Sequence, residues 1–272
     1  MGEVADHHGE LDGLPIFWRS AESPAGTVTP FYVHGVPTSS DEWPAFLART
    51  GGIAPDLPGF GRSGKPGYLN YTMDEYDRFL GQFLDEQGLD RVSLVVHDWG
   101  AVGLLPAMRM PERFARIVIV NAVPFLPGYR WHRTARIWRT PGLGELSMGT
   151  TNRFTLKLLT RESNVTPGPL PEEWIESTLR SFDQGTQRAI LRLYRSSPPE
   201  RLGAAGQRLG ELRVPTLVVW GTQDPYLPAR FGRAYAQAIP GAELVEYDDA
   251  GHWAWLDRPD VIDRVAAFLS GG

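Results

Sequence analysis

Residues 92–103 read VSLVVHDWGAVG. The run from 92 to 96 is mostly apolar and β-branched, which favours a buried strand, and the Gly- and Ala-containing residues after Trp99 favour a helix. A sharp turn between such a strand and helix projects one side chain above the carboxyl end of a sheet, and here that side chain belongs to Asp98. Taken alone, Asp98 fits equally well as a cap of the following helix.

Other short β-rich runs recur along the chain, and helix-like segments follow several of them. We expect buried strands at residues 29–33, 92–96, 117–120, 216–220 and 244–247. This alternation predicts an α/β protein with a mostly parallel sheet. The segment LDGLPIFWRS, which precedes the first of these strands, predicts an antiparallel hairpin arm at the edge of the sheet.

The alternation stops between Val123 and Val214. This stretch has helix-like segments at 131–138, 152–160, 172–182 and 187–194, so we expect a helical cap domain over 124–213 and a core domain formed by 1–123 and 214–272. The insertion is basic, with 13 Arg and one Lys against eight acidic residues, whereas the rest of the chain is acidic. Complementary charge can dock the two parts, or the basic insertion can bind an anionic ligand.

Composition excludes several classes of function. The 272 residues carry a net charge of -5 and contain no cysteine. Disulfides, thiolate nucleophiles, iron-sulfur clusters and cysteine-based zinc sites are therefore excluded. We expect no nucleic-acid or membrane partner, no metal and no cofactor, and a cytoplasmic location; the oligomeric state is left open.

Two further polar residues follow predicted strands near the C-terminus. Asp224 lies in WGTQDPYLP and His252 in YDDAGHWAWL. With Asp98 they give the order nucleophile, acid, base, each at the carboxyl end of a strand. The alternatives are that Asp224 is only a turn residue and that His252 is only a loop histidine.

Five short motifs resemble those of α/β-hydrolases that use an aspartate nucleophile. They are HGVP (34–37), DLPGFGRS (56–63), HDWG (97–100), GTQDP (221–225) and GHW (251–253). Within that superfamily the chain is similar to epoxide hydrolases and haloalkane dehalogenases. The resemblance implies the α/β-hydrolase fold, in which a mostly parallel twisted sheet is flanked by helices and carries an inserted helical cap domain.

The resemblance also implies a mechanism. Asp98 would form a covalent alkyl ester with the substrate, and His252, oriented by Asp224, would activate the water that hydrolyses this ester. The backbone N–H groups of Val36 and Trp99 would form the oxyanion hole. His34, Gly35 and Pro37 belong to the same motif loop. Some dehalogenases resemble this chain but carry their acid at the position of Asn121, where an amide supplies no charge.

Two activities remain open on this basis. Epoxide hydrolases use two cap tyrosines as proton donors, and Tyr129 and Tyr194 are the tyrosines of the insertion. Dehalogenases bind the departing halide with N–H donors, and many place an Asn where this chain has Val36; Trp99, with Trp131, Trp138 or Trp174, offers indole N–H groups instead. We expect an epoxide hydrolase acting on a small, largely apolar epoxide and water. The alternatives are a haloalkane dehalogenase with the same triad and, less favoured, a non-catalytic ligand receptor.

Overall fold

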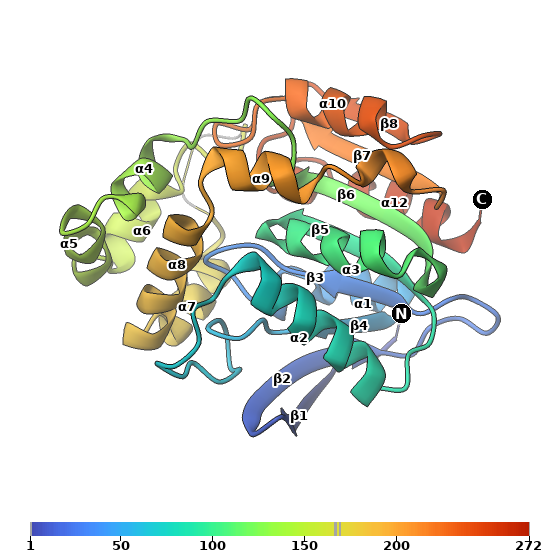
Figure 1. The fold of residues 1–272 in the computed structure, drawn as a ribbon, viewed down its shortest axis with the longest axis horizontal. Helices are drawn as coiled ribbons and strands as arrows, with labels where there is room; N and C mark the ends of the chain where they lie inside the picture. Colours follow the sequence, from blue (N-terminus) through green and yellow to red (C-terminus); the bar gives the residue numbers. More distant parts are fainter. Residues whose placement is uncertain (1, 166–167, 169, 272) are drawn as a thin grey trace.

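A parallel sheet with an antiparallel hairpin at one edge forms the centre of the computed structural model, which describes residues 2–165, 168 and 170–271. In these residues the eight strands are ordered β1-β2-β4-β3-β5-β6-β7-β8. Pairing is antiparallel for β1 with β2 and for β2 with β4, and parallel from β4 to β8. The strands are β1 (Ala5–Leu11), β2 (Leu14–Ala21), β3 (Pro30–Val33), β4 (Gly52–Pro55), β5 (Val92–Asp98), β6 (Phe114–Ala122), β7 (Thr216–Gly221) and β8 (Glu243–Tyr247). The predicted fold and the edge hairpin are confirmed (Figure 1).

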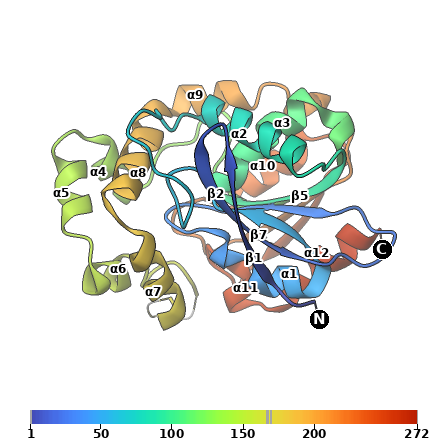
Figure 2. The ribbon, with the colours of Figure 1, turned by 90° about the horizontal axis from the view of Figure 1, so that it is seen from below.

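Helices cover both faces of the sheet. Figure 2 shows α2, α3 and α10 on one face and α1, α11 and α12 on the other. Side chains of β5 alternate between the two layers, with Leu94 and Val96 in one apolar cluster and Val95 in the second. The core helices are α1 (Pro44–Thr50), α2 (Met73–Glu86), α3 (Leu104–Arg109), α10 (Arg230–Ala238), α11 (Ala254–Asp257) and α12 (Asp260–Ser270). Short 3₁₀ helices are η1 (Ser40–Glu42), η2 (Trp99–Gly103), η3 (Pro111–Arg113) and η4 (Leu209–Glu211).

Six α-helices and the short η4 separate β6 from β7 in the described residues. The α-helices are α4 (Arg133–Arg139), α5 (Leu143–Gly149), α6 (Arg153–Leu159), α7 (Glu172–Ser181), α8 (Gln184–Ser196) and α9 (Pro199–Ala205). Figure 1 shows α4 to α8 beyond one end of the sheet. Trp99, which directly follows β5, packs against Tyr194 of α8 with ring centroids 5.3 Å apart. The inserted helices therefore lie over the carboxyl ends of the parallel strands.

Polar contacts join α8 and its neighbours to the loop that precedes α2. Lys65 forms an ion pair with Asp183 at 3.0 Å, and Arg188 and Arg192 donate to the backbone oxygens of Lys65 and Gly67 at 2.7 and 2.8 Å. In the ion pair the cation belongs to the core and the acid to the insertion, and the two arginines bind backbone oxygens, so docking by complementary charge stays a prediction. Among the described residues, no helix is both long and apolar enough to cross a membrane.

Candidate active site

Asp98 occupies a strained turn at the end of β5. Its φ of 49° lies in the left-handed region, which non-glycine residues rarely adopt. Neighbouring glycines make the turn possible, since a Cβ on Gly100 would lie 2.0 Å from the Val33 carbonyl oxygen and one on Gly35 would lie 2.5 Å from the Asp98 Cβ. The Asp98 side chain does not cap the helix η2 that follows. The interpretation of Asp98 as a helix cap is therefore wrong.

The two carboxylate oxygens of Asp98 lie in different surroundings. Oδ1 accepts a hydrogen bond from the Val36 backbone N–H at 2.9 Å, whereas Oδ2 lies 3.8 Å from His252 Nε2. Burial raises the pKa of this carboxyl, while the charges of His252 and His97 and the N–H groups of Val36 and Trp99 oppose the rise. One oxygen is thus held where an oxyanion would need donors, and the other faces the imidazole.

Asp224 orients His252. Its Oδ2 lies 2.8 Å from His252 Nδ1, and its Oδ1 accepts from the backbone N–H groups of Tyr226 and Leu227 at 2.8 and 2.9 Å. Burial alone would raise the pKa of Asp224, but the His252 charge and these donors hold it below its usual value. Burial alone would lower the pKa of His252, and the Asp224 carboxylate raises it instead. The arrangement leaves His252 Nε2 free to accept a proton.

Asn121, which the sequence presented only as an unsuitable acid, supports Asp224. Its Nδ2 donates to Asp224 Oδ2 at 2.8 Å, and its Oδ1 accepts from the Gly221 N–H at 2.8 Å. A φ of 35° turns Asn121 at the end of β6. Asp224 therefore receives both the histidine and the amide on one oxygen.

The structure brings both candidate tyrosines close to the nucleophile. Tyr129 and Tyr194 are buried, and both pack against the Trp131 ring, with centroids 5.1 and 4.9 Å away. Burial raises the pKa of each phenol well above its usual value, and the Asp98 charge adds to the rise. Both hydroxyls therefore stay protonated and able to donate.

The indole groups differ in how they are used. Trp99 Nε1 is buried and forms no hydrogen bond of normal geometry with any residue that the structure describes. Its indole still interacts with the Tyr194 hydroxyl, and this interaction opposes the rise in the pKa of that phenol. Trp131 Nε1 donates to the Ser197 carbonyl oxygen at 3.0 Å. Trp138 packs edge-on against Tyr194, and Trp174 packs against Trp253. Of the tryptophans considered from the sequence, Trp99 carries the buried donor that lacks an acceptor of normal geometry among the described residues.

The remaining motif residues lie around the nucleophile. His34 Nδ1 contacts the Gly35 carbonyl oxygen at 2.7 Å, and His34 Nε2 accepts from the Leu57 N–H at 2.9 Å. Pro37 follows Val36 through a cis peptide bond. These contacts hold the loop that carries the Val36 N–H.

Sequence reasoning missed several residues next to His252. Tyr226 packs its ring against the imidazole at 5.1 Å, and the Ser163 carbonyl oxygen accepts from the His252 N–H at 2.7 Å. Glu42 lies buried beneath the same loop. Polar residues of this kind carry no sequence motif, and their roles depend on partners far along the chain.

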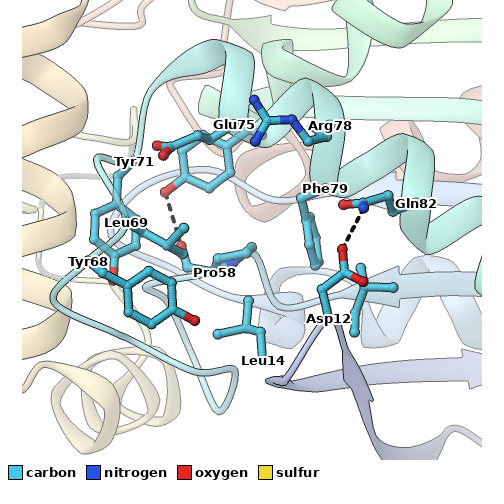
Figure 3. A pocket seen from close by; sticks show the side chains of 12 residues that line it. Asp12, Leu14, Pro58, Tyr68, Leu69, Tyr71, Glu75, Arg78, Phe79 and Gln82 are labelled. Atoms are coloured by element: carbon cyan, nitrogen blue, oxygen red, sulfur yellow. Dashed lines mark hydrogen bonds between the residues drawn. The ribbon is translucent and has the colours of Figure 1, made fainter.

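One hollow of the molecule lies apart from these residues. The pocket in Figure 3, about 180 Å³, lies between the β1–β2 hairpin and α2, with Leu14, Tyr68 and Phe79 among its lining residues. No lining residue of that pocket belongs to the site around Asp98.

Across residues 2–165, 168 and 170–271, no group of three or more acidic or histidine side chains could hold a metal ion.

Comparisons with known proteins agree with this architecture. The model of the alpha/beta hydrolase family matches residues 31–265. A haloalkane dehalogenase from Mesorhizobium japonicum is 27% identical, with 90% of this chain and 85% of that protein covered. A cis-3-alkyl-4-alkyloxetan-2-one decarboxylase from Shewanella oneidensis is 30% identical, with 80% of this chain and 73% of that protein covered. The crystal structure of a haloalkane dehalogenase from Bradyrhizobium elkani USDA94 superimposes with a TM-score of 0.85 at 27% identity, covering 99% of this chain and 98% of that one.

Proposed function

Because this chain belongs to the alpha/beta hydrolase family, we propose that it is a haloalkane dehalogenase that uses Asp98 as its nucleophile. Relatives named haloalkane dehalogenase, at 26–28% identity over most of the chain, support this activity over the epoxide hydrolase expected first from the sequence. Under this proposal, residues 124–213 act as a cap domain that covers an apolar haloalkane.

The geometry supports two chemical steps. Asp98 Oδ2 attacks the carbon that bears the halogen, so that a C–O ester bond forms while the C–X bond breaks and the halide leaves with the electron pair. Water then attacks Cγ of Asp98, and His252 Nε2 takes its proton. The N–H groups of Val36 and Trp99 stabilise the oxyanion on Oδ1. When this intermediate collapses, the C–O bond to the alkyl group breaks, the departing oxygen takes the proton back from His252 and leaves as an alcohol, and the new carboxyl group loses its proton to solvent to restore the carboxylate.

One observation carries the dehalogenase proposal: the indole N–H of Trp99, the residue that directly follows the nucleophile, is buried and forms no hydrogen bond of normal geometry among the described residues. A buried donor without an acceptor costs about 1–3 kcal/mol, so such a group is expected to serve a ligand. A departing halide is a suitable acceptor because it carries a full negative charge and needs no proton. Val36 supplies only its backbone N–H, so Trp99 takes the larger share of halide binding.

A second activity, epoxide hydrolysis, is favoured by Tyr129 and Tyr194. Opening an epoxide leaves an alkoxide that must be protonated, and two buried phenols that feel the Asp98 charge meet this need. The same ester and the same His252-activated water then give a vicinal diol. The two activities therefore share the triad. They differ in the donor that stabilises the leaving group, which is the Trp99 indole for a halide and the two phenols for the epoxide oxygen.

Paired variants separate the two activities. Chloro- and bromoalkanes and terminal epoxides of matched chain length are assayed for halide and diol. Trp99→Phe removes the indole N–H and should slow halide release about 100-fold or more, with a smaller effect on epoxides. Tyr129→Phe combined with Tyr194→Phe should slow epoxide opening roughly 10²- to 10⁴-fold and leave halide release far less affected.

The wild-type product pattern decides the proposal. Diol without halide overturns the dehalogenase assignment in favour of the epoxide hydrolase. Neither product, from a folded protein that still binds these substrates, favours a non-catalytic ligand receptor.

A further inference from the structure

Two short helices of the insertion turn large apolar side chains toward solvent. Figure 2 shows α5 and α6 on the outer side of the insertion, away from the sheet. On α6, Phe154 and Leu158 lie four residues apart and therefore on one side of the helix, and they are 76% and 58% exposed. Leu156, between them in sequence, is buried. The exposed apolar residues of the two helices form an apolar face that consists of Leu143, Leu146, Phe154, Leu158 and Leu159.

The apolar face gathers most of the exposed large hydrophobic residues of the described chain in one place. Only Tyr68 and Val165 of that group lie outside α5 and α6. The two helices are joined by residues 150–152, so their exposed side chains belong to one region of the surface. A helix that packs only within its own chain turns its apolar side chains to the core. Exposed apolar residues gathered in this way indicate a binding surface for another molecule.

The chain around the apolar face is strongly basic. Residues 130–161 hold six arginines and one lysine against a single acidic residue, Glu145. The remainder of the insertion holds seven basic and seven acidic residues, so residues 130–161 carry all of its excess positive charge. The expectation of no membrane partner rested on the charge of the whole chain, which is -5. This part of the chain has the opposite sign.

Some of these cations are paired within the protein and others are free. Arg153 and Lys157 of α6 form ion pairs with Glu172 of α7. The exposed arginines that form no ion pair with any described residue, called the free arginines, are Arg130, Arg133, Arg136 and Arg161. Free cations next to exposed apolar side chains fit a partner that is both anionic and apolar.

An anionic phospholipid bilayer has both properties. Its negatively charged headgroups attract arginines, and apolar side chains insert between the lipids below them. Phe154 protrudes from the surface, and a lipid layer accepts a protruding side chain without a preformed groove. A second copy of this chain, related by two-fold symmetry, would instead bring the same basic surface against itself, and the like charges would repel.

We propose that the apolar face and the free arginines dock this protein on the surface of an anionic phospholipid bilayer. The helices lie on the bilayer and do not cross it. Docking requires no reaction at Asp98, so it is measured as binding alone and is independent of the proposed function.

The first test compares the binding of wild-type protein to two kinds of vesicle. One kind is pure phosphatidylcholine, and the other contains equal parts of phosphatidylcholine and phosphatidylglycerol. The partition coefficient, measured by vesicle sedimentation, should be at least about tenfold higher on the mixed vesicles and should fall as salt is added. Equal binding to both kinds overturns the proposal. Binding to neither overturns it in favour of an acidic protein as the partner.

The second test removes the apolar face. Phe154→Ser combined with Leu158→Ser should lower the partition coefficient on mixed vesicles about tenfold or more, because two side chains no longer insert. The matched control is Tyr68→Ser, which removes a side chain that is 72% exposed in the loop before α2 and should leave binding unchanged. An equal loss in both proteins, or no loss in the double variant, overturns the proposal. Circular dichroism checks that the variants are folded, and the wild-type comparison decides the matter if they are not.

The third test removes charge and keeps the apolar face. Arg133→Gln combined with Arg136→Gln should weaken binding to mixed vesicles about tenfold and leave binding to pure phosphatidylcholine unchanged. The control pair is Arg78→Gln with Arg91→Gln, two exposed arginines of the core. Equal effects of the two pairs would mean that total charge, and not this surface, governs binding, which overturns the proposal.

Sedimentation velocity without lipid tests the second copy as the occupant. The Phe154→Ser, Leu158→Ser variant should sediment as the wild type does, because the apolar face is not expected to join two chains. A wild-type dimer that this variant dissociates would show that a second copy covers the face, and the lipid proposal would be wrong.

Discussion

The residue His252 is needed in only one of the two steps of the proposed reaction. Ester formation needs only an ionised Asp98, whereas ester hydrolysis needs a base for water. His252 Nε2 faces Asp98 Oδ2 at 3.8 Å while Nδ1 is held by Asp224 at 2.8 Å. Removal of the imidazole should therefore stop the cycle after the first step.

The variant His252→Gln should accumulate the covalent ester. Intact-protein mass spectrometry should show an increase equal to the transferred alkyl group less one hydrogen after incubation with a haloalkane, or equal to the whole epoxide after incubation with an epoxide. Asp98→Asn should gain no mass. His132→Gln is the matched control, because burial lowers the pKa of His132 to about 4 and its Nδ1 accepts from the Ala135 N–H at the start of α4. Wild-type turnover by His252→Gln would exclude His252 as the base.

The sequence could predict the site residues that directly follow a strand. It could not predict the residues whose role depends on partners far along the chain. Asp98, Asp224 and His252 each follow a strand, so the carboxyl edge of a parallel sheet brings them together. Glu42 and His97 are 55 residues apart, and Asn121 and Asp224 are 103 apart. Nothing in a local pattern marks a glutamate as buried when its stabilising donors come from other loops.

At the level of elements, continuous apolar runs were predicted well and short or polar elements were not. The strands predicted at 29–33, 92–96 and 216–220 correspond to β3, β5 and β7. Strand β4, with the sequence GIAP, was missed because Gly and Pro weaken the strand signal. Helices α5 and α9 were missed because neither has a full amphipathic pattern.

The N-terminal cap of helix α2 can be tested by its effect on the free energy of unfolding, with no expected change in the rate of the reaction. Thr72 and Glu75 form a capping box, in which the Thr72 hydroxyl accepts from the Glu75 N–H at 3.3 Å and the Glu75 carboxylate accepts from the Thr72 N–H at 3.0 Å. Thr72→Ala should lower the free energy of unfolding by about 1 kcal/mol, because it leaves a backbone donor without its cap. Urea unfolding measures the change, and Thr72→Ser should retain most of the stability. Equal stability of the Ala and Ser variants would contradict a capping role.

At the scale of the whole molecule, the inserted helices and the sheet meet over the site through α8. One side of α8 carries Arg188 and Arg192, which donate to backbone oxygens of the loop before α2. Another side carries Tyr194, which packs against Trp99 and Trp131. A single helix thus links the docking of the insertion to the position of a candidate proton donor. Backbone oxygens of the core thus serve as the acceptors of Arg188 and Arg192.

Weakening the docking contact should therefore loosen α8 and affect chemistry at a distance. Arg192→Gln removes the charged donor to the oxygens of Gly67 and Leu69, and hydrogen bonds from charged groups contribute about 1.5–3 kcal/mol. Amide hydrogen exchange in α8 should become severalfold faster, and epoxide opening should fall more than halide release because Tyr194 moves with the helix. Arg133→Gln, which alters an exposed arginine at the start of α4, is the control and should change neither quantity. Unchanged exchange in α8 of the Arg192 variant would show that apolar packing alone holds the helix over the site.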